Sequence, residues 1–103
     1  MVGVEIHIRL EKEKRYEFLQ AVRFCSLKCK EISACIEQML YENVFEEGRF
    51  MWVEHWDNAE SLKTHLQSDP FRGLLGAVDV LGQMEIALLT DLEQLPANMN
   101  KIS

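Results

Sequence analysis

The sequence offers a carboxylate and an imidazole that could work together as a general base. Trp52, Glu54 and Trp56 alternate along residues 50–56, a segment with the composition of a strand, so their side chains share one face. His65 follows on the apolar stripe of a predicted helix. If the strand turns this face toward the helix, Glu54 meets His65, raises the pKa of the imidazole and fixes its tautomer. The alternative is that both are core residues, with Glu54 bracing the helix.

Two other groups of side chains also have the residue types of a functional site. Cys25 and Cys29 lie four residues apart on one helical face, and Cys35 is the obvious third ligand if they hold zinc. We expect them to be small buried side chains instead, and we expect neither a metal nor any other cofactor. We expect the second group to be a set of paired ions rather than a ligand site; it comprises Glu5, His7, Arg9 and His55.

The periodicity of apolar residues predicts the elements that position these side chains. Residues 2–10 alternate as a strand, and residues 12–32 have the period of an amphipathic helix. Strands are then predicted at 34–45 and 50–56, joined by a turn at Gly48. A helix capped by Asp57 or Asn58 restarts at Asp69-Pro70, where Asp69 is the predicted cap and Pro70 the first helical residue. It ends at Gly82, before a last strand at 84–89. This order is α+β, a ferredoxin-like βαββαβ domain over residues 1–92 with a four-stranded antiparallel sheet and a tail at 93–103.

The strands are too apolar for a sheet that leaves one face in water. Met51 and Val53, with Ala87 and Leu89, are predicted to face away from the helices. Two such sheets packed face to face would cover them, so we expect a homodimer that forms a dimeric α+β barrel. Glu5, His7 and Arg9 would then lie inside the dimer and must pair with one another.

Size and charge exclude several classes of protein. The 103 residues fit one domain, and 48% hydrophobic residues are enough for a core. A net charge of −6 argues against nucleic-acid binding. No apolar run is long enough to span a membrane, and the first ten residues do not resemble a signal peptide. We therefore expect a cytoplasmic protein that does not bind membranes, in which an odd number of cysteines makes a disulfide framework unexpected.

One stretch of the chain, residues 54–71, resembles the signature of the antibiotic-biosynthesis monooxygenase family. It has Glu-x-Trp at the end of a strand, Ala59 in the first helical turn, then His-x-x-Ser and the nearby Phe71. Cys35 also resembles a family cysteine, although Ala34 stands where the family usually has glycine. The resemblance implies a dimeric α+β barrel with a cavity between sheet and helices. Known activities of the family are cofactor-free oxidation of quinols and anthrone-like phenols, haem degradation and isomerisation of a small phosphorylated signal.

The resemblance predicts a cofactor-independent monooxygenase that acts on a quinol or polycyclic phenol. His65 would be the base and Glu54 would orient it, in a slot for a flat aromatic that is lined by Trp52, Trp56, Phe71 and Tyr41. Haem degradation is disfavoured because Leu75 stands where the family's haem degraders have an axial histidine. The alternatives are a non-catalytic dimeric domain that binds a small molecule, and an isomerase of a small phosphorylated molecule that uses Arg72 and Lys63.

Overall fold

The chain folds in the predicted order in the computed structural model, which describes residues 1–91. The predicted tail at 93–103 lies outside the described residues. A short 3-10 turn, Lys12–Lys14, precedes the first helix. The strands and helices are β1 Val2–Leu10, α1 Arg15–Lys30, β2 Cys35–Glu42, β3 Arg49–Trp56, α2 Ala59–Leu66, α3 Asp69–Leu81 and β4 Gly82–Asp91. The ferredoxin-like α+β prediction is confirmed.

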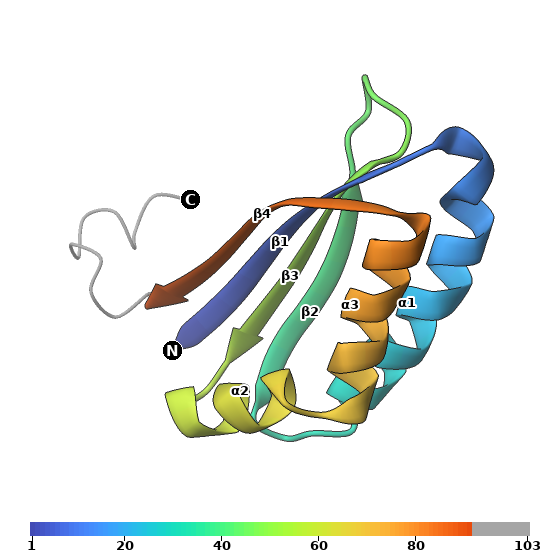
Figure 1. The fold of residues 1–103 in the computed structure, drawn as a ribbon. Helices are drawn as coiled ribbons and strands as arrows, with labels where there is room; N and C mark the ends of the chain where they lie inside the picture. Colours follow the sequence, from blue (N-terminus) through green and yellow to red (C-terminus); the bar gives the residue numbers. More distant parts are fainter. Residues whose placement is uncertain (92–103) are drawn as a thin grey trace, which may run out of the picture.

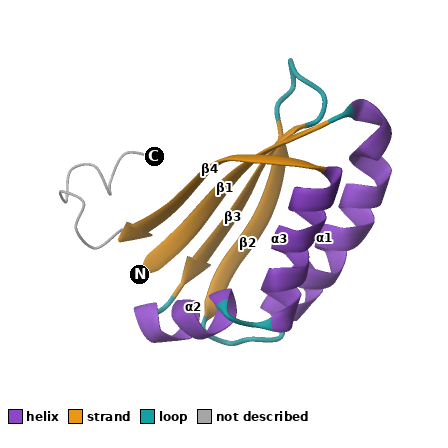
Figure 2. Cartoon of the chain, in the orientation of Figure 1, coloured by secondary structure: helices purple, strands orange, loops and turns teal. Residues whose placement is uncertain are grey.

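The four strands form one antiparallel sheet in the order β2-β3-β1-β4, with all the helices on one side of it (Figures 1 and 2). Ile6 of β1 lies opposite Trp52 of β3, and both face the helices. The core fills the space between this sheet face and the two longer helices; it includes Ile6, Ile8, Phe18, Val22, Trp52, Trp56, Leu74 and Val78. Burial of these side chains is the main force that holds the helices on the sheet.

Local sequence explains how each helix begins. Asn58 caps α2, because its side-chain oxygen accepts the N–H of Ser61 at 2.8 Å. The cap of α3 is Ser68, which accepts the N–H of Phe71 at 3.4 Å, so the prediction that Asp69 is the cap was wrong by one residue. The hairpin turn before β3 contains Gly48 at a φ of 88°, as its sequence predicts. None of the described helices is long and apolar enough to cross a membrane.

The sheet face away from the helices carries apolar side chains, but only partly the ones predicted. Met51 and Val53 lie there, opposite His7 and Glu5. The prediction for Ala87 and Leu89 was wrong, because they pair with Ile6 and Val4 on the helix side. Ile86 and Leu88 take the outer face and are 46% and 47% exposed. Every residue from 86 to 89 is apolar, so alternation could not fix the direction of β4, and a register shift opposite His7 and Ile8 also changes the pairing.

The charged side chains of the second group are all paired, but only His7 and Glu5 pair with each other as predicted, whereas Arg9 and His55 pair with glutamates outside the group. His7 contacts Glu5 at 2.7 Å, and Arg9 lies 3.5 Å from Glu85. His55 contacts Glu37 at 3.1 Å on the neighbouring strand. These contacts are partly exposed, so each stabilises the fold only slightly.

Candidate active site

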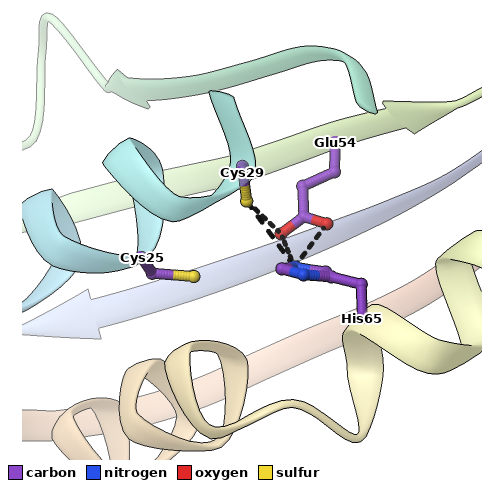
Figure 3. Close-up of side chains that lie close together, drawn as sticks. All are labelled: Cys25, Cys29, Glu54 and His65. Atoms are coloured by element: carbon purple, nitrogen blue, oxygen red, sulfur yellow. Dashed lines mark hydrogen bonds and ion pairs between the residues drawn. The ribbon is translucent and has the colours of Figure 1, made fainter. Parts of the chain in front are cut away.

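The structure brings Glu54 and His65 into direct contact beneath the helices. Glu54 lies near the end of β3 on the face that holds Trp52 and Trp56, and His65 lies in the last turn of α2. The Nε2 atom of His65 is 3.0 Å from Glu54 Oε1 and 3.1 Å from Oε2 (Figure 3). The predicted meeting of the two side chains is therefore confirmed.

Both oxygens of the Glu54 carboxylate accept hydrogen bonds from tryptophan. The indole N–H of Trp52 donates to Oε2 at 2.7 Å, and that of Trp56 donates to Oε1 at 2.8 Å. The carboxylate thus receives three N–H donors while its side chain is 0% exposed. A buried carboxylate needs such donors to replace water, and these fix its orientation.

The ring of His65 lies between two aromatic side chains. Its centroid is 4.7 Å from that of Trp56 and 5.2 Å from that of Phe71. Nε2 faces Glu54, whereas Nδ1 is one of two buried side-chain atoms within residues 1–91 that have no hydrogen-bond partner. In the neutral ring, Nε2–H therefore donates to the carboxylate and Nδ1 carries the lone pair. Nδ1 is the atom that can take up a proton.

The surroundings make this imidazole more basic than usual. Burial by itself lowers the pKa of His65, but the contacts with Cys29 and the Glu54 carboxylate outweigh it and raise the pKa to about 9. Proton uptake at Nδ1 creates an imidazolium beside the carboxylate, which is the charge pair that Glu54 is placed to stabilise.

Two cysteines of α1 complete the cluster, and the sequence analysis did not predict this. Cys29 Sγ lies 3.6 Å from His65 Nε2 and 3.9 Å from Glu54 Oε2, and Cys25 lies one turn earlier on the same helix (Figure 3). A hydrogen bond with Cys25, together with burial, raises the pKa of the Cys29 thiol far above its usual range. Burial also raises the pKa of Cys35, to about 12. The four-residue spacing was the available signal, but it could not show that α1 lies over Glu54.

The four residues predicted to form the aromatic slot are not all together. Trp56 and Phe71 pack on the ring of His65, as described above. Trp52 instead lines a groove of about 480 Å³ between α1 and β2, together with side chains such as Leu19, Val22 and Leu40. Tyr41 was placed wrongly, because it pairs with Met51 on the opposite face of the sheet and is 46% exposed. Met39, Leu40 and Tyr41 are consecutive bulky side chains, so the pattern of β2 did not show which of them faces inward.

The fold and the site together define a ferredoxin-like domain with a buried imidazole–carboxylate pair between its sheet and its helices. Comparison with known proteins gives the family of this domain. The model of the antibiotic biosynthesis monooxygenase family matches residues 1–75, and the chain belongs to this family. A Bacillus subtilis protein named "Putative monooxygenase YcnE" is 27% identical over 75 residues, which are 73% of this chain and 79% of that protein.

Two solved structures illustrate how closely the fold is shared. A crystal structure of an antibiotic biosynthesis monooxygenase has a TM-score of 0.80 at 20% identity and covers 93% of this chain and 100% of its own. The Streptomyces nogalater protein SnoaB, a cofactor-independent oxygenase, has a TM-score of 0.78 at 12% identity, with 93% of this chain and 96% of that chain covered. At these identities the likeness concerns the fold alone.

Proposed function

We propose that this protein is a cofactor-independent monooxygenase that oxidises a quinol or polycyclic phenol of the anthrone type. The observation that carries the proposal is the buried pair in which Glu54 holds Nε2 of His65 and leaves Nδ1 without a partner. The family, and the cofactor-independent oxygenase among the structural neighbours, support it. In this proposal His65 is the base and Glu54 its positioning residue.

The proposed reaction needs only substrate, dioxygen and a base. His65 Nδ1 takes a proton from the activated substrate, and the resulting carbanion-like phenolate reduces dioxygen as a carbon–oxygen bond forms. The peroxide then loses water when its O–O bond breaks, with the stored proton returned and the second C–H proton released. This balance is that of an anthrone, in which a methylene becomes a carbonyl, one oxygen atom enters the product and the other leaves as water. The substrate supplies all four electrons, so the atoms and charges balance without a flavin or a metal.

The groove between α1 and β2 is the proposed route for the substrate. Its volume of about 480 Å³ lies in the range of small-molecule sites, and its lining combines apolar side chains such as Leu19 and Leu40 with polar ones such as Arg23 and Gln38. Trp52 is one of its lining residues, and the indole N–H of Trp52 is bonded to Glu54. Because the side chains of Glu54 and His65 are 0% and 1% exposed, the structure must open before a substrate can reach Nδ1 of His65. The same burial would protect the anion from water.

We also propose that the protein works in the cytoplasm as a homodimer in which two outer sheet faces meet. Ile86, Leu88 and Met51 would be covered by this contact, and Glu5 and His7 would enter it already bonded to each other. Sedimentation at micromolar concentration tests this arrangement, and Leu88→Lys should shift the dimer toward monomer. A wild-type protein that sediments as a stable monomer would contradict it.

Oxygen consumption with a panel of anthrones and quinols tests the proposed reaction. The protein is first treated with a chelator, and circular dichroism checks that each variant is folded. We expect His65→Ala to lose at least 100-fold in turnover, the lower range for removal of a general base. The matched control is His55→Ala, which removes a partly exposed histidine that is also paired with a glutamate. Equal turnover in the two variants would remove His65 from the mechanism.

Binding without turnover is the competing function, because the pair is closed off from solvent. In that case anthrones would bind and change the tryptophan fluorescence without oxygen uptake. His65→Ala would then change only the affinity for anthrones. The same oxygen-electrode experiment, run beside a fluorescence titration, separates the two functions.

A further inference from the structure

We propose that Cys25, Cys29, Glu54 and His65 form a binding site for a thiophilic divalent cation, with Zn²⁺ as the ion of best fit. Three separate elements supply the ligands. The cysteines come from successive turns of α1, Glu54 from β3 and His65 from α2 (Figure 3). One ligand atom from each residue lies within 4.8 Å of all the others, and all four residues are buried.

Three of the six distances between the ligand atoms are close to those of a tetrahedral zinc site, and the other three, which join Cys25 Sγ to the rest, are at most 4.8 Å. Bonds of about 2.3 Å to sulfur and about 2.0–2.1 Å to nitrogen or oxygen place S and N about 3.6 Å apart, and N and O about 3.4 Å apart. Cys29 Sγ is 3.6 Å from His65 Nε2, and Nε2 is 3.1 Å from Glu54 Oε2. The third edge, Cys29 Sγ to Glu54 Oε2, is 3.9 Å, against about 3.6 Å for that geometry. Small side-chain shifts around a central ion would close these differences.

The surroundings of the ligands also suit a metal ion. Zinc binds thiolate, imidazole and carboxylate, and carboxylate ligands are usually held by hydrogen bonds from a second layer of residues. Trp52 and Trp56 already hold the Glu54 carboxylate in this way. Two thiolates and one carboxylate would carry three negative charges. Zn²⁺ would leave one, which the two indole N–H groups offset.

An ion at this site would stop the proposed oxidation, and this consequence rests on the proposed function. Zinc bound to Nε2 of a neutral imidazole requires the ring proton to be on Nδ1. Nδ1 is the atom proposed to take the substrate's proton, so the occupied site has no free base. The metal-bound and oxygenase forms would therefore exclude each other, and cellular zinc would set how much of the protein is active.

Cobalt substitution tests the site without reference to activity. Full-length protein is stripped of metal with a chelator and titrated with Co²⁺ under reducing conditions. We expect one ion per chain, with thiolate-to-cobalt charge-transfer absorption and the intense visible bands of tetrahedral cobalt, both of which Zn²⁺ abolishes. Cys25→Ser and Cys29→Ser should each lose about half of the charge-transfer band and bind Zn²⁺ at least about 100-fold more weakly.

The third cysteine of the chain provides the matched control. Cys35→Ser removes a thiol outside the four-ligand cluster and should keep the full spectrum. A loss in Cys35→Ser as large as in Cys29→Ser would overturn the ligand set, and weak octahedral cobalt bands in the wild type would overturn the site. If a serine variant does not fold, Cys29→Ala replaces it, and the increase in melting temperature on addition of Zn²⁺ is compared with that of the wild type. An equal increase in Cys29→Ala would also overturn the site.

A separate arm tests the link to catalysis. Equimolar Zn²⁺ should abolish oxygen uptake by the wild type but not the residual uptake of the Cys25→Ser/Cys29→Ser double variant. If no anthrone or quinol is oxidised by any form, the proposed function fails while the cobalt spectrum still decides the metal site.

Discussion

Replacing Glu54 by glutamine should both destabilise the fold and lower the basicity of His65. The carboxylate accepts N–H bonds from Trp52, Trp56 and His65 at 2.7, 2.8 and 3.0 Å. Glutamine has the same shape but only one acceptor oxygen, and its NH₂ group would face a donor. The tryptophan N–H that faces the NH₂ group and the NH₂ group itself would then both be buried donors without an acceptor, at roughly 1–3 kcal/mol each, so we expect a loss of about 2–6 kcal/mol in the free energy of unfolding.

Urea unfolding followed by tryptophan fluorescence measures this loss at the site itself, because Trp52 and Trp56 are the two tryptophans of the chain. The matched control is Glu37→Gln, which removes the partner of His55 from an exposed pair at 3.1 Å. That change should cost no more than about 1 kcal/mol. In Glu54→Gln the pKa of His65, followed by NMR, should fall from about 9 toward its ordinary value of 6.5. Equal free energies of unfolding for the two variants, with an unchanged His65 pKa in Glu54→Gln, would contradict this prediction.

Three further predictions concern stability. Folding raises the pKa of His65 from 6.5 to about 9, so protonation of His65 should stabilise the metal-free protein fully below pH 6.5, and roughly 3 kcal/mol of the free energy of unfolding should be lost as pH rises through 9. Urea midpoints across this range measure the loss, and a midpoint independent of pH would contradict it. Gly3→Ala should lower the free energy of unfolding by about 1–3 kcal/mol, because the added Cβ would lie 2.8 Å from the Glu54 carbonyl oxygen. Gly73→Ala, whose Cβ would lie in open space, should be neutral or stabilising. Thermal melts that rank the two variants the other way would contradict this. Asn58→Ala should cost about 1 kcal/mol by removing the cap of the helix that carries His65, and Asp57→Ala should not, as comparison of their melting curves would show.

The sequence predicted the parts of the site that depend on local pattern. Strict alternation in β1 predicted which of its side chains face the helices, the period of two in β3 put Trp52, Glu54 and Trp56 on one face, and the stripe of α2 predicted an inward-facing His65. These two periodicities were enough to bring Glu54 and His65 together. They were also enough for the order of the elements, since each strand and helix has its own period and turn residues.

The errors occurred where the pattern was ambiguous or where contacts depend on tertiary packing. Tyr41 and Leu89 lie in strands with bulky apolar residues at consecutive positions, so neither face was marked by polar side chains. The grouping of Cys25 and Cys29 with Glu54 depends on how α1 lies across β3, and no local pattern encodes that docking. The unpartnered Nδ1 of His65 likewise follows from packing rather than from residue type.

The pH dependence of kcat/KM for an oxidised anthrone tests the proposed base most directly. In metal-free wild-type protein, kcat/KM should rise about tenfold per pH unit and level off near the His65 pKa of about 9. In Glu54→Gln the same limb should move to lower pH, and in Glu37→Gln it should stay in place. A profile that is flat across this range, or one that does not move when Glu54 is replaced, would contradict a mechanism in which Glu54 holds His65 as the base.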